Sequence, residues 1–284
     1  MLNVGVHAES RLLPFIRQHR GLVARMLALD LLLMPLVTWL VVLALDLSRP
    51  VAVGMVLLAV APGVPLAPKL ARVAAGSEML AIARVVLAGA ITAFTGPASA
   101  RLLLGYQGQV DIHAGHLILR LVAVQWLPLA AGIALHAWRP RWAARVEKIT
   151  SVVSSAALGL LIVVLIVPRL PVLGDLGWGG FVAALTTTAM GWALGFLTGG
   201  HEADMRRTVA ATTSPPNVGL SMAILTAVAA PPQFGAAVFA LFLVKALANL
   251  VFAKILGRRA APRGRRPWHG KQAGWFLAQR SAGR

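Results

Sequence analysis

Charged side chains inside apolar stretches are the residues of this sequence most able to do chemistry. Asp30 stands in the middle of one such stretch, Arg84 stands about a turn and a half into another, and Lys69 follows a proline-rich interruption between them. Ionisable groups cost much free energy inside a membrane, so those found there are candidates for a functional role, such as binding ions or charged solutes. Asp30 could form a buried ion pair with Lys69 or with Arg84. The alternative interpretation is that these charges merely neutralise one another.

Two interruptions of apolar segments supply a second kind of binding group, the free backbone. One covers 61–68 and the other 212–217, and both contain prolines. Proline removes a backbone donor and breaks a helix, and at membrane depth the freed groups must be covered by protein or line a polar cavity. A helix that resumes after a break offers an N-terminus that attracts carboxylates and sulfonates. The serine and threonines of the second break could instead bond back to helix carbonyls. The predicted substrate or ion pathway consists of Asp30, Pro62, Gly63, Pro68, Lys69, Arg84, Thr212, Ser214, Pro216 and Asn217.

The composition places these residues in a membrane. Of the 284 residues 58% are hydrophobic, and only nine are acidic. A soluble domain could not bury this much apolar surface, and several windows reach the ~20 apolar residues that cross a bilayer. We therefore predict an all-α polytopic membrane protein with about eight transmembrane helices, of which two are broken and cross. The expected spans are 22–45, 51–75, 79–103, 116–137, 149–169, 178–199, 207–230 and 235–257.

The distribution of cations predicts the orientation of these spans. The formal net charge is +18, and Lys and Arg concentrate in alternate loops and in the tail. This pattern fits the positive-inside rule better than binding of nucleic acid. It predicts a multi-pass protein of the cell (inner) membrane with both termini in the cytoplasm. We divide the chain into an amphipathic cytoplasmic segment (1–21), a transmembrane transporter domain (22–257) and a basic cytoplasmic tail (258–284).

The two interrupted spans organise the chain into related halves. Each lies between two continuous spans, and the two triplets would face the membrane in opposite senses. Paired interrupted helices at matching places are typical of secondary transporters built from inverted repeats. The spans 116–137 and 149–169 have no partners in the first half. Either the repeat is wrong or two spans belong upstream of Met1.

Several motifs, in this order and spacing, resemble the bile acid:sodium symporter family of ten-helix transporters. They are Met34-Pro35, the stretch Leu47-Ser48-Arg49-Pro50-Val51-Ala52-Val53-Gly54-Met55, the triplet Ala61-Pro62-Gly63, the triplet Gly195-Phe196-Leu197, Asp204, and Asn217-Val218-Gly219-Leu220. The resemblance covers nearly the whole chain. It implies that the family's first helix and most of its second precede Met1, and we expect a mis-assigned start to explain their absence.

The chain departs from that family where the family holds sodium. The resemblance implies polar groups at positions occupied here by Ala67 and Pro68, an acid at Thr212 and a glutamine at Pro216. Further hydroxyls would stand at Ala81 and Val85, and a glutamine at Asp30. A hard cation needs several oxygen ligands, which alanine, valine and proline side chains do not offer. Sodium coupling is therefore doubtful, and a proton carried by Asp30 is a possible replacement.

These observations predict a secondary transporter of a small organic anion that works by alternating access. The alternative is a degenerate, non-transporting membrane protein with a structural or interaction role. We find no phosphate-binding loop, nucleophile elbow or pair of catalytic carboxylates in the sequence, so we predict no enzyme activity and assign no catalytic residue, cofactor or metal site. The expected partners are the lipid bilayer and the transported anion.

Overall fold

The computed structural model describes residues 12–105, 114–139, 176–227 and 230–260, with isolated positions at 5, 142–143, 145–146, 149–150 and 152–153. Within these residues every regular element is a helix and none is a strand, which confirms the all-helical prediction. Most of the span predicted at 149–169 lies outside the described residues, as do the basic tail from 261 onward and most of the segment before residue 12.

The first long apolar helix contains a wide turn. After α2 (Leu12–Gln18), the chain forms α3 (Arg20–Ala28), a π-helical turn η1 (Leu29–Leu33) and α4 (Met34–Ala44) without leaving the helix. Pro35 lies in the first turn of α4. A proline cannot donate to the carbonyl four residues earlier, and its ring crowds that carbonyl. The π turn directly before Pro35 accommodates both defects, and it contains Asp30.

The first predicted interruption separates two short helices, α5 (Arg49–Ala59) and α6 (Ala67–Val73), and the long helix α7 (Glu78–Gly105) follows. Both short helices carry proline in their first turn, where its missing N–H would have had no helical partner. Between them Gly63 has a φ of 84°. That left-handed conformation is open to glycine but unfavourable for residues with a side chain.

The second half repeats the motif of one continuous helix followed by two short ones. After α8 (Ala114–Trp138), the described chain resumes with α11 (Gly177–Thr198), followed by α12 (Ala203–Thr213), α13 (Val218–Ala227) and the long α14 (Pro232–Ala260). The second interruption separates α12 from α13, at Pro215 and Pro216, as predicted.

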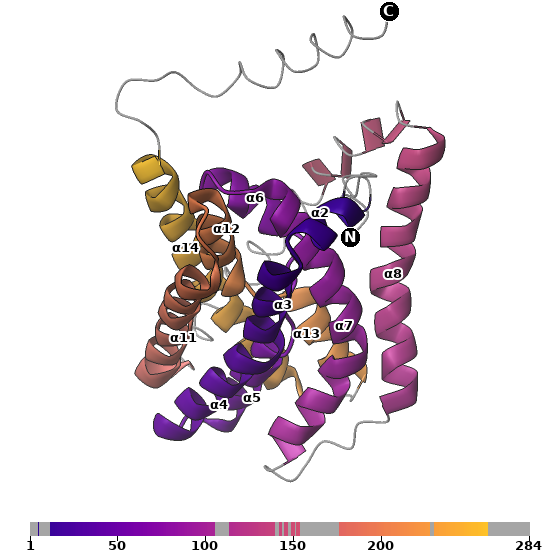
Figure 1. Ribbon diagram of the computed structural model, residues 1–284. Helices are drawn as coiled ribbons and strands as arrows, with labels where there is room; N and C mark the ends of the chain where they lie inside the picture. Colours follow the sequence, from indigo (N-terminus) through magenta and orange to yellow (C-terminus); the bar gives the residue numbers. More distant parts are fainter. Residues whose placement is uncertain are drawn as a thin grey trace, which may run out of the picture.

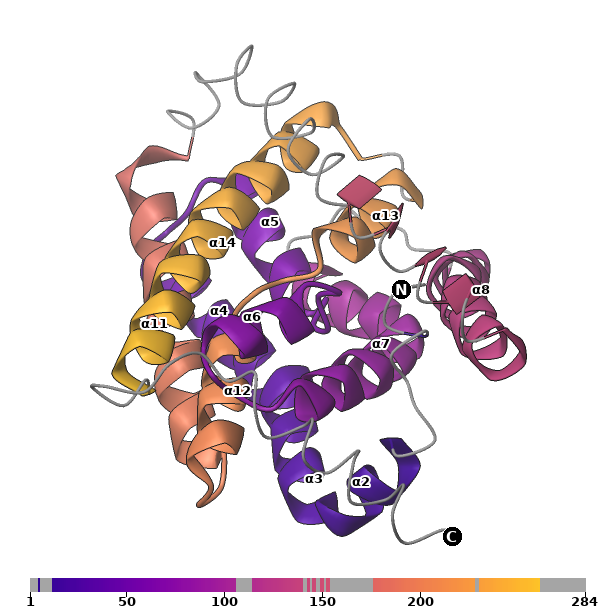
Figure 2. The ribbon, with the colours of Figure 1, turned by 90° about the horizontal axis from the view of Figure 1, so that it is seen from above.

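The central helix of the assembly is α5, which is buried over most of its length. It packs against α14, α4 and α7, and α8 lies at one edge beside α7 while α11 and α14 lie side by side at the opposite edge (Figures 1 and 2). Gly54 lies where α5 closely approaches α14: a Cβ there would come within 3.0 Å of Leu241 Cδ1 and 3.2 Å of the Val238 nitrogen. Small residues permit such close helix packing in membranes.

Four described helical segments are long and apolar enough to cross a membrane. They are Arg20–Ala44, Glu78–Gly96, Gly177–Thr198 and Pro232–Ala260. Together with the broken pairs they support a multi-pass membrane protein, and each agrees in position with the corresponding predicted span, the segment Glu78–Gly96 covering most of the span predicted at 79–103. The total of eight crossings stays a prediction.

Candidate functional site

The two interruptions touch each other in the interior of the protein. The backbone N–H of Asn217 donates to the carbonyl of Ala61 at 2.9 Å, and the Asn217 side-chain amide lies 3.5 Å from the carbonyl of Gly63. Ser221 donates its hydroxyl to the carbonyl of Leu57 at 3.1 Å. The last carbonyls of a helix lack helical partners. Here the second broken segment satisfies the carbonyls that the first leaves open at the end of α5 and in the break after it.

Asn217 also starts the helix after the second break. Its side-chain oxygen accepts the backbone N–H of Leu220 at 3.2 Å, which is how asparagine caps a helix N-terminus. The residue is buried. One side chain therefore fixes the beginning of α13 and the separation of the two interruptions.

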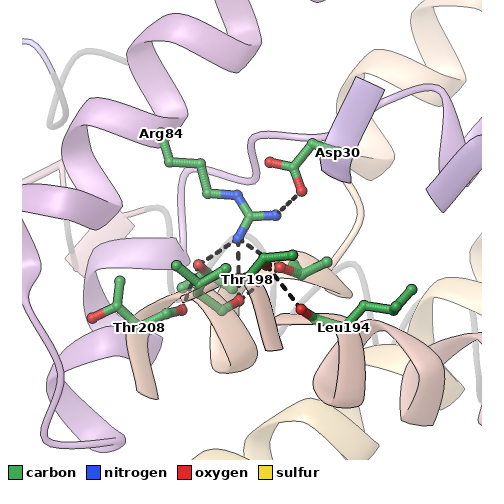
Figure 3. Close-up of polar contacts among 8 residues, drawn as sticks. Asp30, Arg84, Leu194, Thr198 and Thr208 are labelled. Carbon is green, nitrogen blue, oxygen red and sulfur yellow. Dashed lines mark hydrogen bonds and ion pairs between the residues drawn. The ribbon is translucent and has the colours of Figure 1, made fainter. Parts of the chain in front are cut away.

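A buried ion pair lies beside this junction. Asp30, in the π turn, accepts a charge-assisted hydrogen bond from the Nη2 atom of Arg84 on α7, and each residue is only 1% exposed. In Figure 3 the guanidinium group lies between Asp30 and the helix that carries Thr208. Of the two partners that the sequence left open for Asp30, the structure selects Arg84. Lys69, the other candidate partner, is exposed on α6 and is not part of the buried pair.

Arg84 extends the ion pair to the end of α12. Its Nη1 atom donates to the hydroxyls of Thr212 at 2.6 Å and Thr213 at 3.2 Å, and lies 3.5 Å from the carbonyl of Val209. The two threonine hydroxyls donate their own protons to the carbonyls of Thr208 and Val209, each at 2.7 Å. The hydrogen bonds that we expected from these threonines to helix carbonyls are thus present. The same hydroxyl oxygens accept hydrogen bonds from the guanidinium group.

Some polar atoms at this site have no hydrogen-bond partner among the described residues. They are Asp30 Oδ2, Arg84 Nε and Ser214 Oγ, all buried. Buried polar groups are nearly always paired. Unused hydrogen-bonding capacity therefore remains at the point where α12 ends and the second break begins.

The other predicted pathway residues divide between the junction and the surface. Pro62, Gly63 and Pro216 are buried at the junction, whereas Pro68 is half-buried at the start of α6. Lys69, one residue further, is exposed. Thus the sequence correctly singled out both breaks and the charged pair. Among the described residues of the first half, Arg84 is the only buried cation.

Sequence reasoning missed a second buried cation, Lys245 in the middle of α14. It is 5% exposed, and its ammonium group donates to the hydroxyl of Thr187 on α11 at 2.9 Å. One turn later Asn249 donates to the Lys245 carbonyl at 2.7 Å and accepts the indole N–H of Trp192 at 2.8 Å. The signal was present, since Lys245 is an ionisable residue in the centre of an apolar span.

Contacts on both sides of Lys245 bracket its position along the first broken pair. Along α14, Val238 and Leu241 pack against Gly54 of α5, and Gly257 packs against Val73 at the end of α6. Lys245 falls between these contacts, and so does the break between α5 and α6. The other acidic residues that the structure describes all lie at helix ends or in loops. They are Asp46, Glu78, Glu202 and Asp204. The described interior therefore holds one carboxylate and two cations.

The sequence profile of the Sodium Bile acid symporter family matches residues 1–175. The matched part includes α5, α6 and α7 and the pair Asp30 and Arg84, and it ends just before α11. No curated protein matches the chain.

Proposed function

The chain belongs to the sodium bile acid symporter family, and we propose on that premise that it is a secondary transporter of a small organic anion. The observation that carries the proposal is the contact between the two interrupted helices, in which the Asn217 N–H meets the Ala61 carbonyl. Broken helices that meet inside a membrane bundle are where secondary transporters bind their substrates. Alternating access then moves one bundle of helices against the other around this junction.

A matched pattern of contacts supports an inverted repeat. In the first half the helix after the broken pair carries Arg84, which bonds Asp30 on the helix before the pair. In the second half the helix after the broken pair carries Lys245, which bonds Thr187 on the helix before the pair. The same relationship recurs with a threonine in place of the carboxylate. This supports an inverted repeat in which each half contains one broken pair. On that basis we propose that the broken helices cross and that the membrane domain has eight spans over 22–257.

The charge balance supports an anion as the substrate. Asp30 neutralises Arg84, whereas Lys245 has a hydroxyl as its partner and no acid beside it among the described residues. An isolated buried charge is costly. A carboxylate or sulfonate that approached the break between α5 and α6 would offset that cost, and a cation would increase it.

The helix ends support the proposed orientation. Lys69 and Arg72 on α6 and Arg206 and Arg207 on α12 are found at one end of the bundle, where α14 also ends with Arg258 and Arg259 (Figure 1). Under the positive-inside rule this end faces the cytoplasm. We propose a location in the cell (inner) membrane with both termini in the cytoplasm.

Uptake into vesicles tests the transport proposal. The purified full chain is reconstituted in liposomes, and uptake of labelled cholate and of small labelled mono- and dicarboxylates is measured with sodium, potassium or choline outside. We expect saturable uptake of at least one anion that persists without sodium, with or without a pH gradient. Absence of uptake of every anion would favour the alternative of a non-transporting membrane protein.

A further inference from the structure

We propose that the guanidinium group of Arg84 is a tethered cation that permanently fills a cation-binding site made of oxygen atoms. The oxygens come from Asp30, Thr212, Thr213 and the backbone carbonyl of Val209. The protein would thus supply from its own chain the positive charge that a symporter takes from solution. Only the consequence for ion coupling rests on the proposed transport function; the site itself does not.

The oxygen atoms around Arg84 have the composition of a cation site. They comprise a carboxylate, two hydroxyls and a carbonyl, contributed by the π turn η1 and by the last turn of α12. Hard cations are bound by such oxygens. Because Thr212 and Thr213 donate their protons within α12, their lone pairs are directed to an incoming positive charge. Neither η1 nor α12 contributes a cationic side chain to this group of oxygen atoms.

The cation enters from a third element. Arg84 lies on α7, and its side chain spans the distance to both η1 and α12. Its neighbours Ala81 and Val85 on α7 are fully buried and offer no oxygen atoms from their side chains. These are positions where the family resemblance implies ligands for sodium. The resemblance therefore implies that α7 carries a charged group here in place of side-chain ligands for sodium.

The oxygen atoms of this site cannot hold a sodium ion while the guanidinium group of Arg84 occupies it. The guanidinium group makes hydrogen bonds to Asp30 and to both threonine hydroxyls at once, and it is 1% exposed with the rest of its side chain. Two cations among these few oxygens would repel each other in a poorly solvated interior. We therefore expect that the wild-type protein does not bind sodium here, and that removal of Arg84 opens the site.

Thermal unfolding of Arg84→Ala tests the proposal without any transport assay. The purified full chain is heated in detergent in sodium chloride, potassium chloride or choline chloride of equal ionic strength. Without Arg84, Asp30 is a buried carboxylate with no counter-charge, and a small cation would stabilise it. We expect sodium to raise the Tm of Arg84→Ala by about 2 °C over choline, as binding at ~10 times the Kd would do in a chain of this length. The wild-type Tm should not respond to sodium.

Three further variants make the test specific. Asp30→Asn combined with Arg84→Ala removes the carboxylate and should abolish the response to sodium. Arg84→Lys keeps a tethered cation and should behave like the wild type. Arg206→Ala removes an exposed arginine from α12, so its Tm should not become sensitive to sodium. If Arg84→Ala folds too poorly for purification, guanidinium chloride at low millimolar concentration should restore its yield by refilling the site, whereas equal sodium chloride should restore it in part.

The outcomes separate this inference from the transport proposal. An equal Tm of Arg84→Ala in sodium and choline would overturn the inference, even if the wild type transports anions. A rise in the wild-type Tm with sodium as large as that of the variant would overturn it as well. Failure of both guanidinium and sodium to rescue an unstable variant has the same meaning. A sodium response confined to Arg84→Ala would support the inference even if no uptake were found in vesicles.

Discussion

Asn217 on the second broken segment holds the carbonyl of Ala61 on the first by its backbone N–H, at 2.9 Å. The same residue caps α13 through Leu220. The structure thus uses one asparagine to close two open ends of broken helices. Because unpaired backbone groups are expensive in a membrane, this contact is central to the stability of the junction and to its proposed role.

We expect Asn217→Ala to weaken the junction, because it removes the cap on Leu220 and the amide contact with Gly63. Loss of an N-cap costs about 1 kcal/mol, so the Tm should fall by a few degrees and anion uptake should decrease. Thermal unfolding in detergent and vesicle uptake measure the two effects. Thr226→Ala, at an exposed position of the same helix, is the control and should leave both unchanged. Wild-type stability and uptake in Asn217→Ala would contradict the role assigned to this side chain.

We expect the two members of the buried ion pair to be strongly coupled in stability. Asp30→Leu leaves Arg84 charged and without its carboxylate, Arg84→Met leaves Asp30 without its counter-charge, and breaking a buried pair in this way costs roughly 3–5 kcal/mol. The double variant Asp30→Leu with Arg84→Met removes both charges and should be far closer to the wild type. The measurement is a double-mutant cycle from thermal or denaturant unfolding. If the two single effects simply add, the pair does not act as a unit.

We expect Lys245 to matter for transport more than for folding. Lys245→Met keeps the length of the side chain and removes a buried charge, so the Tm should stay level or rise. Uptake of anions should fall on the order of tenfold or more, equivalent to about 1.4 kcal/mol of binding or barrier. Lys254→Met changes an exposed lysine of the same helix and should transport normally. A normal rate in Lys245→Met would remove Lys245 from the anion pathway.

We expect Gly54→Ala to separate α5 from α14. The added Cβ would lie 3.0 Å from Leu241 Cδ1 and 3.2 Å from the Val238 nitrogen, and the backbone atom cannot move aside as a side chain can. Overpacking of this kind costs about 1–3 kcal/mol. Gly21→Ala, where no atom lies within 4 Å of the new Cβ, should stabilise α3 by roughly 0.5–1 kcal/mol. The comparison of the two Tm values tests whether α5 is held as closely as described.

The helices and their interruptions could be predicted because they depend on local sequence. Apolar length gives the spans, and proline gives the breaks at Pro62 and Pro216. The π turn was not predicted, since Pro35 signals a defect in the helix but not which turn absorbs it. That turn contains Asp30 and helps to set the direction of its carboxylate.

The charged partners could be predicted only in part. Asp30 and Arg84 are 54 positions apart in the sequence, so their pairing depends on packing that no local pattern fixes. Lys69 was an equally good candidate partner on the sequence, because the residues around it on α6 are largely apolar. In the structure α6 lies at the end of the bundle. Lys245 was not predicted, because its partner Thr187 carries no charge and a threonine in an apolar span does not indicate a buried cation nearby.

The π turn that contains Asp30 gives the first helix one residue more than a regular helix would need over the same length. Deletion of a single residue between Leu29 and Leu33 would restore regular winding while α3 and α4 keep the faces they now present, because the wide turn already absorbs the extra residue. If the residue lost were Asp30 itself, Arg84 would be left without its acid. The electrical neutrality of this half of the protein therefore depends on which residues one turn retains, so that a lineage could gain or lose it by a single codon.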